Sequence, residues 1–173
     1  MPNARGCRCA PGLWVAVLLS LAAAGADAQS RGERLLQSAH ALLERGLNDQ
    51  ASDEYHDAIN ALDDSERIAE ARYGLAIAQE RSGQAENAID TLAAIPVDLA
   101  FEFRTDTDVL LMTLLARSDR SDEALDAAER VLARTDHAAW PAAASLSVEL
   151  LQRLERHRDA AHTFERTRDI LSD

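Results

Sequence analysis

The chain has 173 residues, of which 47% are hydrophobic and 28% are charged. This composition fits one globular domain and excludes collagen-like and intrinsically disordered proteins. The formal net charge is -12, because the chain has 30 acidic residues and only 18 basic ones. We therefore expect no nucleic-acid partner, since binding to phosphates requires a basic patch.

Residues 1–28 have the pattern of a secretory signal peptide. Two arginines precede an apolar run from Leu13 to Ala26, and a small-residue cleavage site ends at Ala28. The run is shorter than the roughly 20 apolar residues of a membrane-spanning helix, so we predict cleavage after Ala28 and no stable membrane insertion. A retained anchor is the alternative. The processed chain would be periplasmic or secreted and would have no thiol, because Cys7 and Cys9 precede the apolar run.

Beyond residue 28, apolar residues recur at helical spacing along the whole chain. The first two apolar stripes are Leu35, Leu36, Ala39, Leu42 and Leu43, and then Ala51, Tyr55, Ala58, Ile59 and Leu62. Ser30 and Glu33 have the form of a capping box before the first predicted helix, and Gly46 stands where that helix would end. Six further helices are predicted near 66–82, 85–94, 105–118, 121–134, 140–154 and 157–171. The sequence therefore predicts an all-α protein of eight helices in four pairs.

The connection after the second pair has a different pattern. Pro96 should end the preceding helix, and apolar and other residues then alternate from Val97 to Phe103, which predicts an extended segment. One interpretation is that this segment crosses the helix ends and buries Phe101 and Phe103. The other is an exposed apolar edge that is used for self-association or for docking a partner.

The helix pairs form internal repeats. An alanine recurs in each second helix at Ala51, Ala88, Ala124 and Ala160, with spacings of 37, 36 and 36 residues. Four residues after each of these anchor alanines stand Tyr55, Leu92, Ala128 and Phe164. Nine residues before them stand Leu42, Gln79, Leu115 and Leu151. Such a fixed period predicts hairpins that stack and share a continuous core, because one hairpin cannot bury its apolar stripe alone.

The repeated units resemble tetratricopeptide repeats (TPR). The matching residues are Ala39, Gly46, Ala51, Tyr55 and Ala58 in the first unit, and Leu75, Ala76, Gly83 and Ala88 in the second. The later units match less well, because Asp119 and Glu155 replace the turn glycine. The period is also longer than the family's usual 34 residues or so. The resemblance implies an α-α superhelix, a right-handed solenoid of about four TPR-like hairpins, over residues 29–173. The units would span about 30–64, 65–100, 101–136 and 137–173.

The last helix is expected to cap this solenoid. Its charged residues alternate with Phe164, Ile170 and Leu171, so one face would be solvated and the other available to the core.

The chain beyond residue 28 offers little support for catalysis. It has no thiol and no nucleophile elbow, and its His157 and His162 are five residues apart, whereas the helical zinc motif uses a spacing of four. An acidic cluster around Asp53 fits a solvated helix face better than a calcium site, because no ligand loop accompanies it. We therefore expect no catalytic residue, metal or cofactor, and we predict a protein-binding scaffold. The alternative is a subunit or regulatory part of an exported enzyme complex.

The TPR resemblance implies that the concave face of the first helices is the binding surface. The candidate residues for a partner-binding groove are Leu36, His40, Tyr73, Ile77 and Thr113. The alternative to partner binding is a structural role for His40, and Tyr73 could equally pack against the neighbouring unit. The expected partners are other exported or envelope proteins that present an extended peptide or a helix. The acidic charge of the chain favours a partner with basic or apolar segments.

Overall fold

The computed structural model describes residues 31–172, and all regular structure in this range is helical. A helix over residues 31–44 comes first. It is followed by α2 (Asn48–Ala61), α3 (Ser65–Arg81), α4 (Ala85–Ala93), α5 (Arg104–Arg117), α6 (Ser121–Leu132), α7 (Trp140–Arg153) and α8 (His157–Ser172). These bounds agree closely with the predicted helices, so the all-α fold class is confirmed. The predicted signal peptide and Ser30 of the predicted capping box lie outside the described residues.

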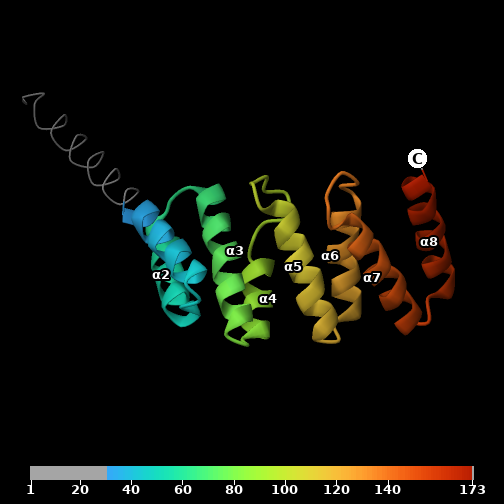
Figure 1. Cartoon of the computed structure of the whole chain (residues 1–173), viewed down its shortest axis with the longest axis horizontal. Coiled ribbons are helices and arrows are strands. Elements are labelled where there is room, and N and C mark those ends of the chain that lie inside the picture. Colours follow the sequence, from blue (N-terminus) through green and yellow to red (C-terminus); the bar gives the residue numbers. More distant parts are fainter. Residues whose placement is uncertain (1–30, 173) are drawn as a thin grey trace, which may run out of the picture.

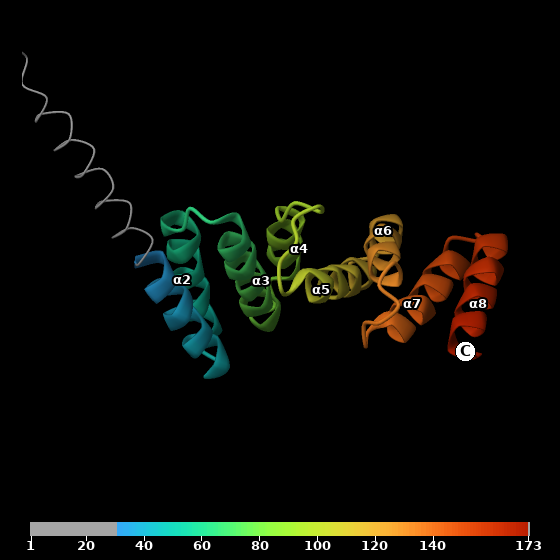
Figure 2. The ribbon, with the colours of Figure 1, turned by 90° about the horizontal axis from the view of Figure 1, so that it is seen from above.

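The helices form antiparallel hairpins that follow one another along a single axis (Figures 1 and 2). Consecutive helices pack together from α2 to α8. The helix over residues 31–44 lies at one end of the row and α8 at the other. Within the described range, no helix combines the length and apolar character required to cross a membrane.

The anchor alanines set the distance between the helices. Ala51, Ala88 and Ala124 have no exposed surface, and Ala160 is 4% exposed. Each donates its backbone N–H to the carbonyl four residues earlier, at the point where the second helix of its hairpin begins. A methyl side chain at this position lets two helices approach closely, because the distance between helix axes depends on the side chains at the contact.

Each first helix ends in the same left-handed turn. The residues in the left-handed conformation are Gly46 (φ 74°), Gly83 (φ 77°), Asp119 (φ 57°) and Glu155 (φ 57°). In each turn the next residue donates its N–H to the carbonyl five residues before it, as in the Schellman motif. The acceptors are Leu42, Gln79, Leu115 and Leu151, with N–O distances from 2.8 to 3.0 Å. Asp119 and Glu155 therefore adopt the backbone conformation of the glycines that they replace.

The connection between α4 and α5 differs from the predicted extended segment. It forms two turns, in which Leu99 N–H donates to Pro96 O (3.2 Å) and Arg104 N–H donates to Phe101 O (3.1 Å). An extended segment needs a neighbouring strand for its backbone hydrogen bonds, and the described residues provide none, so the bonds form locally. Phe101 and Phe103 are both half-buried, whereas Val97 is 62% exposed.

A buried ion cluster holds this connection against the third hairpin. Asp108 of α5 has no exposed surface and accepts hydrogen bonds from Arg104 (2.9 Å), from Arg130 of α6 (2.8 Å) and from Arg134 (3.4 Å). Arg104 also donates to Pro96 O (2.9 Å). A buried carboxylate must be paired, because leaving water is costly for a charge. The cluster therefore fixes the path of the chain between the second and third units.

The expectation that the last helix turns its apolar face into the core is wrong for Phe164, whose surface is 59% exposed. Ala160 is the buried member of α8 that contacts the core cluster. Phe164 stays outside because, within residues 31–172, no helix packs beyond α8.

Candidate functional site

A pocket of about 280 Å³ lies between the helix over residues 31–44 and α3. The lining residues are His40, Leu43, Glu44, Glu70, Tyr73, Gly74, Ile77 and Phe103. We call these eight residues the first-helix groove. Phe103 immediately precedes α5, so residues of three successive units contribute to the groove.

Two aromatic rings form one wall of the groove. Tyr73 and Phe103 stack with ring centroids 5.4 Å apart and an interplanar angle of 14°. Tyr73 is half-buried, and this burial, followed by the nearby carboxylate of Asp106, raises the pKa of its hydroxyl. The hydroxyl is therefore neutral at physiological pH, and the pair presents stacked aromatic surface to the groove.

Two carboxylates give the groove its negative charge. Glu70 pairs with Arg67 through one oxygen, and its other oxygen lies 3.9 Å from His40 Nε2. Glu44 is exposed at the other side of the groove. Aromatic surface beside carboxylates is the combination that binds ammonium and guanidinium groups, through cation–π attraction and charge-assisted hydrogen bonds.

The floor of the groove depends on a glycine. A Cβ atom at Gly74 would overlap the ring of Tyr55, which has no exposed surface. Tyr55 also meets His40 edge to face, with centroids 5.5 Å apart. Its buried hydroxyl has no hydrogen-bond partner among the described residues, and desolvation, followed by the charge of Glu70, raises its pKa. Gly74 thus lets α3 lie directly on the ring of the first unit.

The structure brings together three of the five residues that the sequence suggested, namely His40, Tyr73 and Ile77. Leu36 is 2% exposed and belongs to the core of the first two units, so it does not line the groove. Thr113 is exposed on α5, where its hydroxyl donates to the carbonyl of residue 109 (2.8 Å), and it lies outside the pocket.

Sequence reasoning missed Phe103 and the two carboxylates as groove residues. The carboxylates were within its reach, because Glu70 lies three residues before Tyr73, and Glu44 four residues after His40, on the same helix faces. No sequence signal pairs Phe103 with Tyr73, since the stacking depends on the path of the connection between α4 and α5.

A larger hollow of about 470 Å³ lies between α6, α7 and α8. Its leucine floor is rimmed by Glu129, Asp159, His162 and Arg166, which are all exposed. Across residues 31–168, where side chains are described, no three His, Cys, Asp or Glu residues are grouped closely enough to hold a metal ion. We take the first-helix groove as the candidate site because it places stacked aromatic rings beside two carboxylates.

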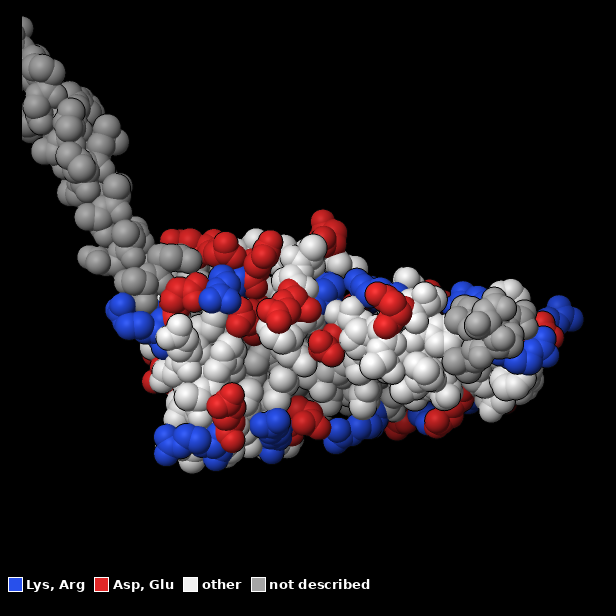
Figure 3. Space-filling model, turned by 45° about the horizontal axis from the view of Figure 1, so that its top comes forward, with Lys and Arg blue, Asp and Glu red and all other residues white. Residues whose placement is uncertain are grey.

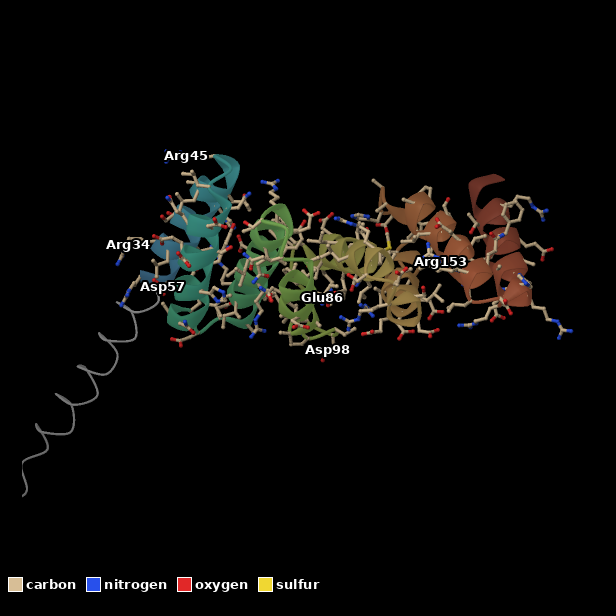
Figure 4. All side chains as sticks on the ribbon, turned by 90° about the horizontal axis from the view of Figure 1, so that it is seen from below. Arg34, Arg45, Asp57, Glu86, Asp98 and Arg153 are labelled. Carbon is tan, nitrogen blue, oxygen red and sulfur yellow. The ribbon has the colours of Figure 1, made fainter. Side chains whose placement is uncertain are left out.

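Charged side chains cover much of the surface. The face in Figure 3 carries more acidic residues over the first two units than over the last two. Figure 4, which labels Asp98 on the connection between α4 and α5 and Arg153 on α7, shows that acidic and basic side chains project along the whole array. On the face that Figure 3 shows, acidic side chains are therefore denser over the two units that contribute most of the groove.

Comparisons with known proteins identify the fold. No family model and no curated protein match the chain. The structure is similar to that of a Podosopora anserina protein described as a kinesin light chain with nearly identical TPR-like repeats. The TM-score is 0.61 at 16% sequence identity, over 83% of this chain and 76% of the other. The chain therefore has a TPR-like repeat fold.

Proposed function

We propose that this protein is a non-catalytic scaffold that binds a peptide or a helix of a partner protein in the first-helix groove. The observation that carries the proposal is the convergence of His40, Tyr73 and Ile77 in one pocket. These residues come from the first helices of two successive units, which is the arrangement that can follow an extended ligand along the array.

The chemistry of the groove favours a basic side chain flanked by apolar ones. Glu44 and Glu70 supply negative charge, the stacked Tyr73 and Phe103 supply aromatic surface, and Ile77 extends the apolar wall. A cation over an aromatic ring contributes about 0.5 to 2 kcal/mol, depending on how far it is desolvated. The net charge of -12 also favours encounter with a basic partner, because complementary fields raise association rates.

The proposed place of action is the cell envelope or the outside of the cell. It rests on the signal-peptide pattern that ends at Ala28. Sequencing the N-terminus of the purified protein tests it, since export with processing yields a chain that begins at Gln29. A chain that keeps residues 13–26 in the membrane fraction would mean an anchored protein instead.

The groove is tested by affinity capture from the cell envelope, followed by cross-linking to locate the bound segment. A Tyr73→Ala, Ile77→Ala double variant should lose the partner, whereas Val97→Ala, at an exposed apolar position outside the groove, should retain it. A synthetic peptide of the cross-linked segment should bind wild type more tightly than Glu70→Gln, and replacing its arginine or lysine by glutamine should have a similar effect. Equal capture by the wild type and the double variant would remove the groove from the proposal.

An enzyme complex is the other outcome of the same experiment. Capture of an enzyme whose turnover changes when this protein is added would assign the chain a regulatory role. Turnover of a small molecule by the purified chain alone would contradict a non-catalytic scaffold.

A further inference from the structure

The repeat register shows what covers each unit of the array. At the three internal junctions, the side chain four residues after the anchor alanine is buried: Tyr55 and Ala128 have no exposed surface, and Leu92 is 1% exposed. The first helix of the next unit packs on each of these second helices, as α3 packs on α2, α5 on α4 and α7 on α6. At the first junction, Gly74 of α3 lies against the ring of Tyr55. The residue at the same register in the fourth unit is Phe164, which is 59% exposed.

The surface around Phe164 combines a projecting ring with a hollow. The hollow, of about 250 Å³, is lined by Val148 and Gln152 of α7 and by His157, Ala160, Ala161 and Phe164 of α8. We call these six residues the C-terminal end face. Its residues belong to α7 and α8, which lie at the far end of the row of helices in Figure 1, whereas the groove is lined mainly by the helix over residues 31–44 and by α3.

We propose that the C-terminal end face joins two copies of this protein about a two-fold axis. A contact of this kind requires one surface to carry both a protrusion and its receptor, since each copy must offer the same patch to the other. Phe164 and the adjoining hollow meet this requirement on a single face. The exposed methyl group of Ala161 lets the two α8 helices approach closely.

The charge distribution favours this end for the contact. The fourth unit, residues 137–173, has six acidic and five basic residues, whereas the first, residues 30–64, has eight acidic and three basic ones. A contact between two fourth units therefore joins the ends with the smaller net negative charge, and it keeps the more acidic first units apart. Repulsion between like charges would oppose the reverse arrangement.

The opposite end of the array does not offer a matching receptor. The first two units are 37 residues apart, so Gln37 of the first unit is equivalent to Gly74 of the second. Gly74 is the residue that accommodates the ring of Tyr55 because it has no side chain. Gln37 and its neighbour Ser38 are both exposed and polar. Phe164 would thus meet a polar side chain there, so head-to-tail joining is disfavoured relative to the two-fold contact.

The proposal is tested by sedimentation velocity, which measures the oligomeric state over a range of protein concentrations. The protein is purified in the form that its own cells produce. The wild type should form dimers, and Phe164→Glu should raise the dissociation constant at least about tenfold. Val97→Glu is the matched control, because Val97 is 62% exposed but lies outside the end face, and it should dimerise like the wild type. Since both positions are exposed, thermal unfolding of the wild type and of both variants should agree at concentrations below the dissociation constant of the dimer, where all three are monomeric.

A second measurement locates the contact. Ala161→Cys, in a chain with Cys7 and Cys9 replaced by serine, should form a cross-linked dimer with a short thiol reagent. The proposal is overturned if the wild type is a monomer at all concentrations, or if open-ended oligomers form. It is equally overturned if a Phe101→Ser, Phe103→Ser variant loses the dimer while Phe164→Glu keeps it. The groove lies away from the end face, so a monomeric wild type or open-ended oligomers leave the proposed peptide binding to its own test. Loss of the dimer in the Phe101→Ser, Phe103→Ser variant would instead place the contact at the groove, because Phe103 lines it.

Discussion

Replacing Gly83 by alanine should lower the free energy of unfolding, although alanine is the better helix former. Gly83 lies in the turn that follows α3 and has a φ of 77°, a conformation that costs an L-residue about 1 to 2 kcal/mol. A Cβ atom at this position would have nothing within 4 Å, so no steric clash adds to the conformational cost. Alanine also lowers the conformational entropy of the unfolded chain relative to glycine, which raises the free energy of unfolding by about 0.4 to 1 kcal/mol. The expected net loss is about 0.5 to 1 kcal/mol.

The same reasoning predicts a gain where a non-glycine residue holds this conformation. Glu155→Gly should raise the free energy of unfolding by about the same amount, because Glu155 has a φ of 57°. Asp119→Gly should gain less, since aspartate tolerates the left-handed region better than glutamate. The two kinds of substitution therefore change stability in opposite directions at equivalent positions of the repeat.

Urea and thermal unfolding, followed by helical circular dichroism, measure these effects. A change of 1 kcal/mol corresponds to roughly 2 to 4 °C in Tm for a domain of this size. Gly83→Asn serves as the control, because asparagine adopts the left-handed conformation more readily than alanine and should lose less stability. If Gly83→Ala leaves stability unchanged and Glu155→Gly lowers it, the conformational account of these turns is refuted.

Two further predictions concern charged groups. Asp108→Ala should lower the free energy of unfolding in urea by about 3 to 5 kcal/mol, because it leaves the buried Arg104 without its carboxylate. Glu80→Ala, which breaks the exposed pair with Arg117, should lower it by less than about 1 kcal/mol. Similar losses in the two variants would contradict this account of the cluster. Hydrogen bonds from Arg67 lower the pKa of Glu33 below its ordinary value of 4.5. The pair therefore stabilises the folded state above pH 4.5, and this stabilisation is lost as the pH falls through the lowered pKa. Glu33→Gln should therefore reduce stability at neutral pH, and its difference from the wild type should vanish in acid; a constant difference across the titration would exclude this linkage.

The sequence by itself determined the helices and their repeat. Apolar spacing depends only on residues one or two turns apart, so it located each helix to within a few residues. The anchor alanines gave the register, and that register correctly placed the turn positions at Asp119 and Glu155, where no glycine marks them. Three of the five candidate groove residues also followed from the register, since equivalent positions on successive first helices face the same side.

Only the tertiary structure decided the remaining features, because each depends on contacts between distant segments. The two turns of the connection after α4 bring Phe103 against Tyr73, and the same path brings Arg104 to Asp108. Leu36 has the helical register of a groove residue but is covered by the core of the first two units. Phe164 has the register of a core residue but is exposed, because burial at that position requires a neighbouring helix that the described residues do not supply.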